Sequence, residues 1–412
     1  MKSPFGVPEN PEFTFGLDGP LSKLKMEVLK EGVSIIVLTG FGGSGKTTLA
    51  TKLCWDEQVK GNFSPCGVNF YLFTRKNTSD TDSDYYNNHF IILHDTLRDL
   101  AIYESTKEQS KQRKRVMIDI NENDPEWNLG EKQQGMMTRI LSNYETCTSY
   151  WSNMRATKAE VLILNLRTNQ HFLPGFLKEM SKLKVLVVTN YSFHPSEMNN
   201  FELLGSLPKL KRIRLERISV PSFVTLKNLK KLSLYLCNTR QAFENGYMLI
   251  SDSFPNIEDL NIDYCKDMVE LPEGLCDITS LKRLSVTNCH KLSALPQEIE
   301  KLGNLELLRL NSCTDLEGVP DSIGGLSNLR ILDISNCVGL SNLPEDFGKL
   351  FNLRNLYMTS CARCELPSSI INLKNLTKVV CDEETAASWE PFKPMLPNLN
   401  ISRINGSFSV GI

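Results

Sequence analysis

Apolar side chains recur with a fixed period of 24 residues through the last third of this 412-residue chain. Successive units open at Ile257, Leu281, Leu305, Leu329 and Leu353. Within each unit the apolar positions first alternate with other residues, which is typical of a short strand buried on one face. Because no single unit can bury its own apolar residues, the units must stack into a curved solenoid with a shared core.

The spacing inside each unit identifies the type of repeat. The unit that opens at Leu305 reads Leu-x-x-Leu-x-Leu-x-x-Cys, and the segment from Val319 to Leu326 returns along the outer side. This is the leucine-rich-repeat (LRR) template, with cysteine in the position that takes asparagine or cysteine. Weaker copies of the strand pattern lie at Val161–Leu166, Leu183–Val188, Leu210–Leu215, Leu229–Leu234 and Leu376–Cys381.

The regular and the weaker units together predict about ten parallel strands between Glu160 and Asp382. The expected fold class is therefore α/β, an LRR solenoid at residues 159–400 followed by a C-terminal tail at 401–412. Strand side chains that face solvent form the concave inner wall, which is where solenoids usually bind their partners.

Charged residues gather on this expected concave wall. Between Gly205 and Lys231 there are eight Lys or Arg residues and one Glu. Five of these cations should face the concave side: Lys211, Arg212, Arg214, Lys230 and Lys231. The next strand presents acidic residues instead: Glu258, Asp259 and Asp263. Two interpretations stay open, ordinary solvated strand charge or a docking patch for an acidic partner surface.

Five cysteines keep the same 24-residue step. They are Cys265, Cys289, Cys313, Cys337 and Cys361. Stacked strands lie about 4.8 Å apart, so neighbouring cysteines could approach the distance of a disulfide. Their side chains should all point into the solenoid and serve the turn backbone, so we predict reduced, buried thiols. Cys361-Ala-Arg-Cys364 matches half of a redox or zinc motif, but no second pair accompanies it.

Composition limits the classes of function. The chain has 46 basic and 48 acidic side chains and a net charge of −2, which argues against a general nucleic-acid or membrane-surface binder. We expect no signal peptide at Met1–Pro4 and no bilayer-spanning segment, because the longest apolar runs are short. Twelve cysteines then indicate a reducing, cytoplasmic setting. The basic run Lys111–Arg115 fits a nuclear-localisation patch or, as we prefer, a solvated lead-in to a strand.

A glycine-rich segment near the start of the chain matches the pattern GxxxxGK[ST]. Its candidate ligand-binding residues are Gly40, Gly42, Gly43, Gly45, Lys46, Thr47 and Thr48. An apolar, β-rich run precedes the loop and a helical pattern follows it. Glycines let backbone N–H groups wrap a phosphate, Lys46 balances its charge, and the Thr47 hydroxyl can ligate Mg²⁺. The sequence therefore predicts a nucleotide phosphate site.

The rest of a P-loop domain is difficult to find. Only Val68–Thr74 reads as a following strand, and a polar linker, Asn77–Asp84, comes after it. Between Lys46 and His94 there is no apolar strand that ends in paired acids, which would hold the metal and the attacking water. We reject Val116–Asp119 as a substitute and do not expect ATP hydrolysis.

A P-loop ahead of an LRR array resembles the layout of plant nucleotide-binding leucine-rich-repeat (NLR) immune receptors. The amino-acid sequence also resembles the helper branch of that family, whose full-length members begin with a powdery-mildew-resistance-type coiled coil. The stretches that carry the resemblance are Val7–Asp18, Asn88–Ala101, Gly130–Ile140 and Phe201–Leu207. The coiled coil and most of the nucleotide domain (NB-ARC) have no counterpart in this sequence.

The resemblance implies roles for individual residues. It assigns Gly40–Thr48 to the phosphates of ADP or ATP with Mg²⁺, and His94 to the histidine of the winged-helix domain that senses ADP. Leu93 stands where the family has methionine. From the residues alone, His94 would be a polar residue at the start of a helix that Asp95 caps. The implied domains are a partial NB-ARC fragment at 1–76, a linker and winged-helix remnant at 77–118, and a polar connector at 119–158.

The resemblance further implies plant innate immune signalling through protein contacts of the concave LRR face, with an impaired ADP/ATP switch. Lipase-like immune heterodimers are the implied partners, and neither nucleic acid nor a membrane segment is expected. Two alternatives stay open: an LRR scaffold or decoy that binds no nucleotide, and a P-loop ATPase. We expect a cytoplasmic protein, with nuclear or membrane-peripheral placement as alternatives.

Overall fold

The computed structural model describes residues 157–167, 169–243 and 249–403, the backbone of two strands at 115–119 and 140–144, and residues 21, 22, 25 and 56. The chain divides into two compact units, Met1–Ser110 and Lys111–Ile412. In the first unit, Lys25 forms an ion pair with Asp56, with 2.7 Å between Nζ and Oδ2. The predicted phosphate loop, Gly40–Thr48, and His94 lie outside the described residues.

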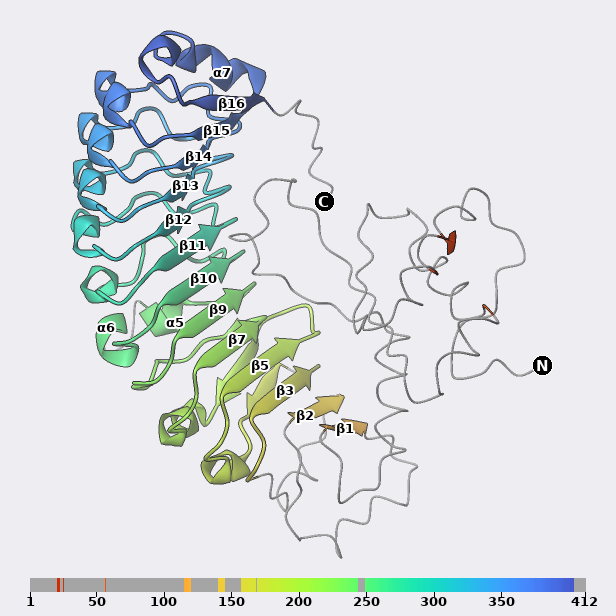
Figure 1. The fold of residues 1–412 in the computed structure, drawn as a ribbon. Coiled ribbons are helices and arrows are strands. Elements are labelled where there is room, and N and C mark those ends of the chain that lie inside the picture. The colour runs from red at the N-terminus through yellow and green to blue at the C-terminus, as the bar shows by residue number, and fades with distance from the viewer. Residues whose placement is uncertain are drawn as a thin grey trace, which may run out of the picture. The chain divides into compact units, whose positions relative to one another are not determined.

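One continuous sheet of thirteen parallel strands organises the second unit (Figure 1). Its strands, in spatial order, are β1 (Arg115–Asp119), β2 (Ile140–Tyr144), β3 (Val161–Leu166), β5 (Val185–Asn190), β7 (Arg212–Glu216), β9 (Lys231–Tyr235), β10 (Asp259–Asp263), β11 (Arg283–Thr287), β12 (Leu307–Arg309), β13 (Ile331–Asp333), β14 (Asn355–Tyr357), β15 (Lys378–Cys381) and β16 (Asn400–Arg403). Equivalent repeat positions pair in register, so Leu308 lies between Leu284 and Leu332. The predicted α/β LRR solenoid is confirmed.

The sheet extends beyond the ten predicted strands at both ends. β1 and β2 pair with each other and with β3, and β16 pairs with β15. β2 lies within the segment 119–158 for which the sequence indicated a polar connector. The basic run that ends at Arg115 leads directly into β1, in agreement with its interpretation as a strand lead-in.

Short helices follow the strands and cover the outer side of the solenoid (Figure 1). They are the 3-10 helices η5 (Gly175–Glu179), η6 (Phe201–Ser206), η7 (Leu275–Asp277), η8 (Ile299–Lys301), η9 (Asp321–Gly325), η10 (Glu345–Lys349), η11 (Ser368–Asn372) and η12 (Lys393–Met395), and the α-helices α5 (Arg240–Phe243), α6 (Ile250–Ser253) and α7 (Glu383–Trp389). Pro320, Pro344 and Pro367 directly precede η9, η10 and η11 in extended backbone. Proline suits this position because its fixed φ and missing N–H do not disturb the helix that follows.

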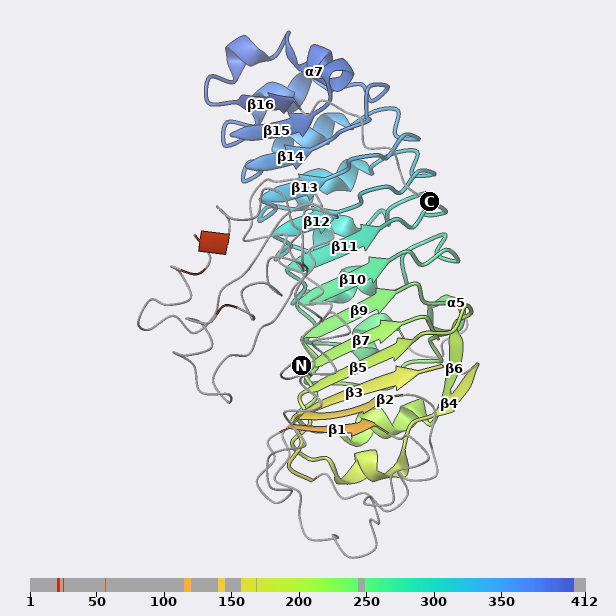
Figure 2. The same ribbon diagram turned by 90° about the vertical axis from the view of Figure 1, so that its right-hand side faces the viewer.

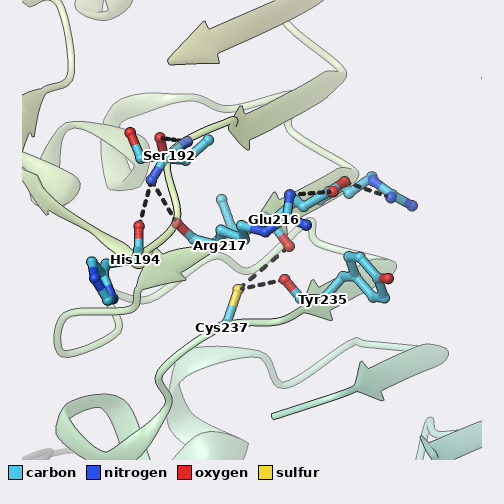
Figure 3. Close-up of polar contacts among 9 residues, drawn as sticks. Ser192, His194, Glu216, Arg217, Tyr235 and Cys237 are labelled. Atoms are coloured by element: carbon cyan, nitrogen blue, oxygen red, sulfur yellow. Dashed lines mark hydrogen bonds and ion pairs between the residues drawn. The ribbon is translucent and has the colours of Figure 1, made fainter. Parts of the chain in front are cut away.

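A second, three-stranded parallel sheet lies on one flank of the early repeats (Figure 2). It contains β4 (Gln170–Phe172), β6 (Ser196–Asn199) and β8 (Ile218–Ser219). The Asn190 amide fixes the loop before β6: its Nδ2 donates to the carbonyls of His194 (2.9 Å) and Arg217 (3.3 Å), and its Oδ1 accepts from the Ser192 N–H (Figure 3). This sheet was not predicted from the sequence.

Leucine side chains from every repeat form one hydrophobic core between the sheet and the outer helices. Leu284, Leu308 and Leu310 are fully buried, and each such side chain contributes about 1.5–3 kcal/mol relative to an exposed one. At the C-terminal side, Trp389 of α7 is also fully buried, and its Nε1 donates to Met358 Sδ at 3.2 Å. Helix α7 thus closes the hydrophobic core over β14 and β15.

A ladder of cysteines joins neighbouring repeats. Cys313, Cys337 and Cys361 each direct the thiol to a carbonyl of the preceding repeat, at 3.4, 3.0 and 3.1 Å. Cys237 makes the equivalent contact with the Leu215 carbonyl at 3.4 Å (Figure 3). All nine described cysteines are free and buried. Burial raises the pKa of Cys337 to about 12, and the prediction of reduced, structural thiols is confirmed.

A second ladder consists of asparagines that directly precede the first leucine of a repeat. Each side-chain Nδ2 donates to a backbone carbonyl of the preceding repeat at 2.7–2.9 Å, as Asn304, Asn328 and Asn352 illustrate. The thiol ladder satisfies buried carbonyls, which would otherwise cost free energy, whereas the asparagine ladder is exposed and joins the turns of neighbouring repeats. This ladder was not predicted from the sequence, although the three asparagines keep the 24-residue step.

Candidate protein-interaction surface

The residue immediately before each strand defines one edge of the concave face. We call this set, taken from β3 to β14, the strand-start column: Glu160, Lys184, Lys211, Lys230, Glu258, Lys282, Glu306, Arg330 and Arg354. Each backbone N–H in the column donates to the carbonyl of the preceding member at 2.8–3.0 Å. This unbroken ladder fixes the spacing of the column, so side chains far apart in the sequence become neighbours.

Ion pairs neutralise part of the strand-start column. Lys184 Nζ lies 2.8 Å from a Glu160 carboxylate oxygen. Glu258 lies between two lysines, with Lys230 Nζ at 2.8 Å and Lys282 Nζ at 3.3 Å. The hydrogen bond from Lys230 lowers the pKa of Glu258, against the effect of burial, and Lys282 adds to the decrease. Glu258 is therefore ionised at neutral pH and offsets much of the positive charge of its two neighbours.

The first strand residues carry a more buried charge network beside that column. The Asp259 side chain is only 5% exposed, and its carboxylate lies 3.0 Å from both Lys231 Nζ and Arg283 Nε. These three residues are in register on β9, β10 and β11. Removal of one partner from a buried ion network is costly because the remaining charge stays desolvated. The network therefore has a structural role.

Arg214 occupies the next position on the concave face and pairs along its own strand. Its Nη2 lies 3.0 Å from Glu216, which also contacts Arg217 at 3.4 Å (Figure 3). Burial lowers the pKa of Arg214, and the hydrogen bond to Glu216 opposes this effect. Both guanidinium groups pair with the same carboxylate, which leaves a net charge of +1 for the three residues.

The opposite edge of the sheet is acidic. We call the residues that strand register and the repeat step align with Asp263 the strand-end column: Asn165, Thr189, Glu216, Tyr235, Asp263, Thr287, Asn311, Ser335, Thr359 and Asp382. It includes three acids and no base. Asp263 accepts hydrogen bonds from Thr287 Oγ1 at 2.7 Å and from Asn288 Nδ2 at 2.8 Å. The two ends of the strands therefore differ in charge.

The structure brings the five predicted partner-binding cations together on two neighbouring strands, where Arg212 is in register with Lys231. Lys230, Lys231 and Arg214 are engaged by acids, as described above, which favours the interpretation of ordinary strand charge for these three. Lys211 and Arg212 are exposed, and no ion pair involves them within the described part of the chain.

Two further exposed cations, Arg330 and Arg354, lie in the same column and were missed by the sequence analysis. Neither takes part in an ion pair with another described residue. Their signal was available in the sequence, since both follow the first leucine of a regular repeat and lie 24 residues apart. The cations available for a partner are therefore more widely spread along the solenoid than the predicted patch.

Other types of site find no support in the described residues. Among them, no group of three or more His, Cys, Asp or Glu side chains is arranged to hold a metal ion. Cys361 belongs to the thiol ladder, and Cys364 is buried. No helix in that part of the chain has both the length and the apolar character needed to cross a bilayer.

Solved structures with some similarity are LRR proteins, and no protein-family model matches the chain. The LRR domain of the type III effector XCV3220 (XopL) is 21% identical, with a TM-score of 0.41 over 73% of this chain and 87% of that one. The Leptospira interrogans LRR protein LIC12759 is 18% identical, with a TM-score of 0.25 over 64% of this chain and 90% of the other. The fold assignment rests on the strand ladder itself.

Curated relatives from Arabidopsis thaliana are much more similar in sequence. The probable disease resistance protein At5g66900 is 54% identical, and disease resistance protein ADR1 is 46% identical, over 79% and 78% of this chain. These matches span 40% and 42% of the relatives' own length. The probable disease resistance protein At5g66890 is 43% identical over 79% of this chain and 80% of its own length. The chain therefore belongs to the ADR1-type family of plant disease resistance proteins.

Proposed function

We propose that this chain acts in plant disease resistance as a protein-interaction module, with the concave face of its strand sheet as the contact surface. The observation that carries the proposal is a set of exposed cations at the strand starts that form no ion pair with any described residue: Lys211, Arg212, Arg330 and Arg354. Family membership supplies the biological setting, and LRR solenoids commonly bind proteins on their concave side. Lipase-like immune heterodimers, which the family resemblance implied, are the partners that we propose to test.

The test is a calorimetric titration of the purified full chain with a purified lipase-like heterodimer. A variant in which Lys211, Arg212, Arg330 and Arg354 are all alanine should bind at least about tenfold more weakly, since rim charges mainly set the association rate and its salt dependence. Lys266→Ala/Lys291→Ala, on the turns after β10 and β11, is the control. Equal affinity of the quadruple variant and the wild type would contradict the assignment of this surface.

Biological relevance needs a readout in plant tissue. Expression of the wild-type chain in leaves should change the disease-resistance response to a pathogen, and the quadruple variant should not. An unchanged response with both proteins, at equal accumulation, would oppose a role in resistance. The cytoplasmic localisation stays a prediction, which imaging of the same tagged chain would test.

Nucleotide binding forms a separate part of the proposal, supported by the GxxxxGK[ST] sequence at Gly40–Thr48. We expect impaired, weak binding of an ADP analogue through this loop, without turnover of ATP. Titration of a fluorescent ADP analogue should give saturable binding that Lys46→Ala removes. Absence of binding would favour the scaffold or decoy alternative, whereas turnover that depends on Lys46 would favour the ATPase.

A further inference from the structure

The concave sheet is electrically polarised across its width. The strand-start column contains six basic and three acidic residues, which leaves a net charge of +3. The first strand residues beside it include four bases and one acid: Arg212, Lys231, Arg283, Lys378 and Asp259. The strand-end column carries a net charge of −3. The strand starts therefore form a basic edge although the whole chain has a charge of −2.

Exposure strengthens this polarity. All six basic members of the strand-start column are exposed, whereas its three acids are half-buried. The side chains of Lys230 and Lys282 are each 46% exposed, compared with 33% for Glu258 between them. Long basic side chains thus extend beyond the acids that they neutralise. A partner that approaches this edge meets positive charge first.

Two pairs of cations flank the neutralised centre of the column. Lys211 and Arg212 lie at β7, and Arg330 and Arg354 lie at the starts of β13 and β14. Six strand intervals separate β7 from β14, which corresponds to about 29 Å at a spacing of about 4.8 Å. An extended peptide covers this distance with about nine residues, at about 3.3 Å per residue.

We propose that the strand-start column binds an extended acidic segment of a partner protein, which lies along the solenoid axis and contacts both cation pairs. The inference rests on the proposed function and adds the chemistry and orientation of the partner. Carboxylates near each end of a segment of about nine residues would pair with Lys211 and Arg212 on one side and with Arg330 and Arg354 on the other. The middle of the segment needs little negative charge, because Glu258 already pairs with Lys230 and Lys282 at the centre of the column.

A polypeptide fits this edge better than a uniform polyanion. A nucleic acid that followed the column would place a phosphate against Glu258 and Glu306, and the acidic strand-end column lies only about 16 Å away, five residues along a strand. An anionic membrane presents the same continuous negative charge. A peptide can place its carboxylates only where cations are unpaired.

The experiment uses the full chain and fluorescently labelled peptides of four, seven, ten and thirteen residues, each with two glutamates at either end and, in the longer ones, an uncharged Gly/Ser spacer between them. Fluorescence anisotropy at low salt should show affinity that rises up to ten residues and then levels off. Lys211→Glu/Arg212→Glu and Arg330→Glu/Arg354→Glu should each weaken binding of the ten-residue peptide by about tenfold, whereas the four-residue peptide should bind weakly to every variant. The control Lys266→Glu/Lys291→Glu makes the same change of charge outside the column and should bind like the wild type.

Unchanged binding by either reversed pair, or affinity that does not depend on peptide length, would overturn the proposal. So would tighter binding of a single-stranded oligonucleotide or of phosphatidylserine vesicles with the same sensitivity to these variants. Circular dichroism and thermal melting of each variant establish that it is folded. If the heterodimer binds but the acidic peptides do not, only this inference fails and the proposed function stands.

Discussion

Replacement of Gly348 by alanine should destabilise the C-terminal repeats. Gly348 is buried in η10, which packs against η11 of the next repeat. A Cβ at this position would lie 2.4 Å from the carbonyl oxygen of Ser369 and 2.6 Å from its Cβ. The carbonyl belongs to the backbone of η11, so it cannot move aside as a flexible side chain would. The two repeats must separate, or the helix must distort.

The magnitude follows from two opposing effects. Overpacking in a dense interior typically costs about 1–3 kcal/mol. Alanine also restricts the unfolded chain and thereby returns about 0.4–1 kcal/mol. The expected net destabilisation is about 1–2 kcal/mol, which lowers Tm by about 2–4 °C in a domain of this size. Gly303→Ala supplies the matched control, since a Cβ there meets nothing within 4 Å.

Thermal unfolding followed by circular dichroism measures the change in Tm, and hydrogen exchange locates it. Repeats in a solenoid contact mainly their neighbours, so Gly348→Ala should accelerate exchange in β14 and β15 and leave β9 and β10 unchanged. Gly303→Ala should be neutral or slightly stabilising. Equal Tm values for Gly348→Ala and the wild type, or an equal loss in both variants, would refute this account of repeat packing.

Three further predictions concern the ladders and the charged edge. Asn328→Ala removes the 2.7 Å hydrogen bond to the Gly303 carbonyl and should cost about 1 kcal/mol in urea unfolding, whereas an unchanged midpoint would contradict the role of the ladder. Burial raises the pKa of the Cys337 and Cys289 thiols to about 12, so a disulfide reagent at pH 8 should label the ladder only after denaturation. The pKa of Glu258 is lowered in the folded protein, so its ionised carboxylate stabilises the fold above the unfolded pKa, and this stabilisation is lost as pH falls. The wild type should therefore be more stable than Glu258→Gln at pH 7, and the two stabilities should converge in acid.

The strands of the solenoid could be predicted because burial imposes the repeat on the sequence. Leucines such as Leu308 and Leu310 are fully buried, and a solenoid offers no alternative position for them. β2 was missed because Ile140–Tyr144 ends in polar residues, and the flanking strands β4, β6 and β8 were missed because two to four residues cannot show alternation. Pairing with neighbouring strands, and not local pattern, forms these elements.

The candidate surface was only partly predictable, for a related reason. The repeat register made the proximity of Lys211 and Arg212 to Lys230 and Lys231 predictable from the sequence. The ionic partners of the lysines could not be predicted, because Lys230 and Lys231 form ion pairs with Glu258 and Asp259, which follow in the sequence only after 27 intervening residues. A count of charges along the sequence treats these two lysines as free, whereas in space they are largely neutralised.

The period of the repeat separates residues that hold the fold from residues that are available for recognition. The repeated leucines fill the core, and the repeated cysteines and asparagines donate hydrogen bonds to backbone carbonyls. A change at Leu308 or Asn328 must therefore affect stability. Strand-start cations such as Arg330 and Arg354 are exposed, and exposed charges contribute at most about 1 kcal/mol. Substitutions of these two arginines, and of Lys211 and Arg212, should therefore leave Tm nearly unchanged. Any loss of binding that they cause at constant Tm can then be assigned to recognition and not to unfolding.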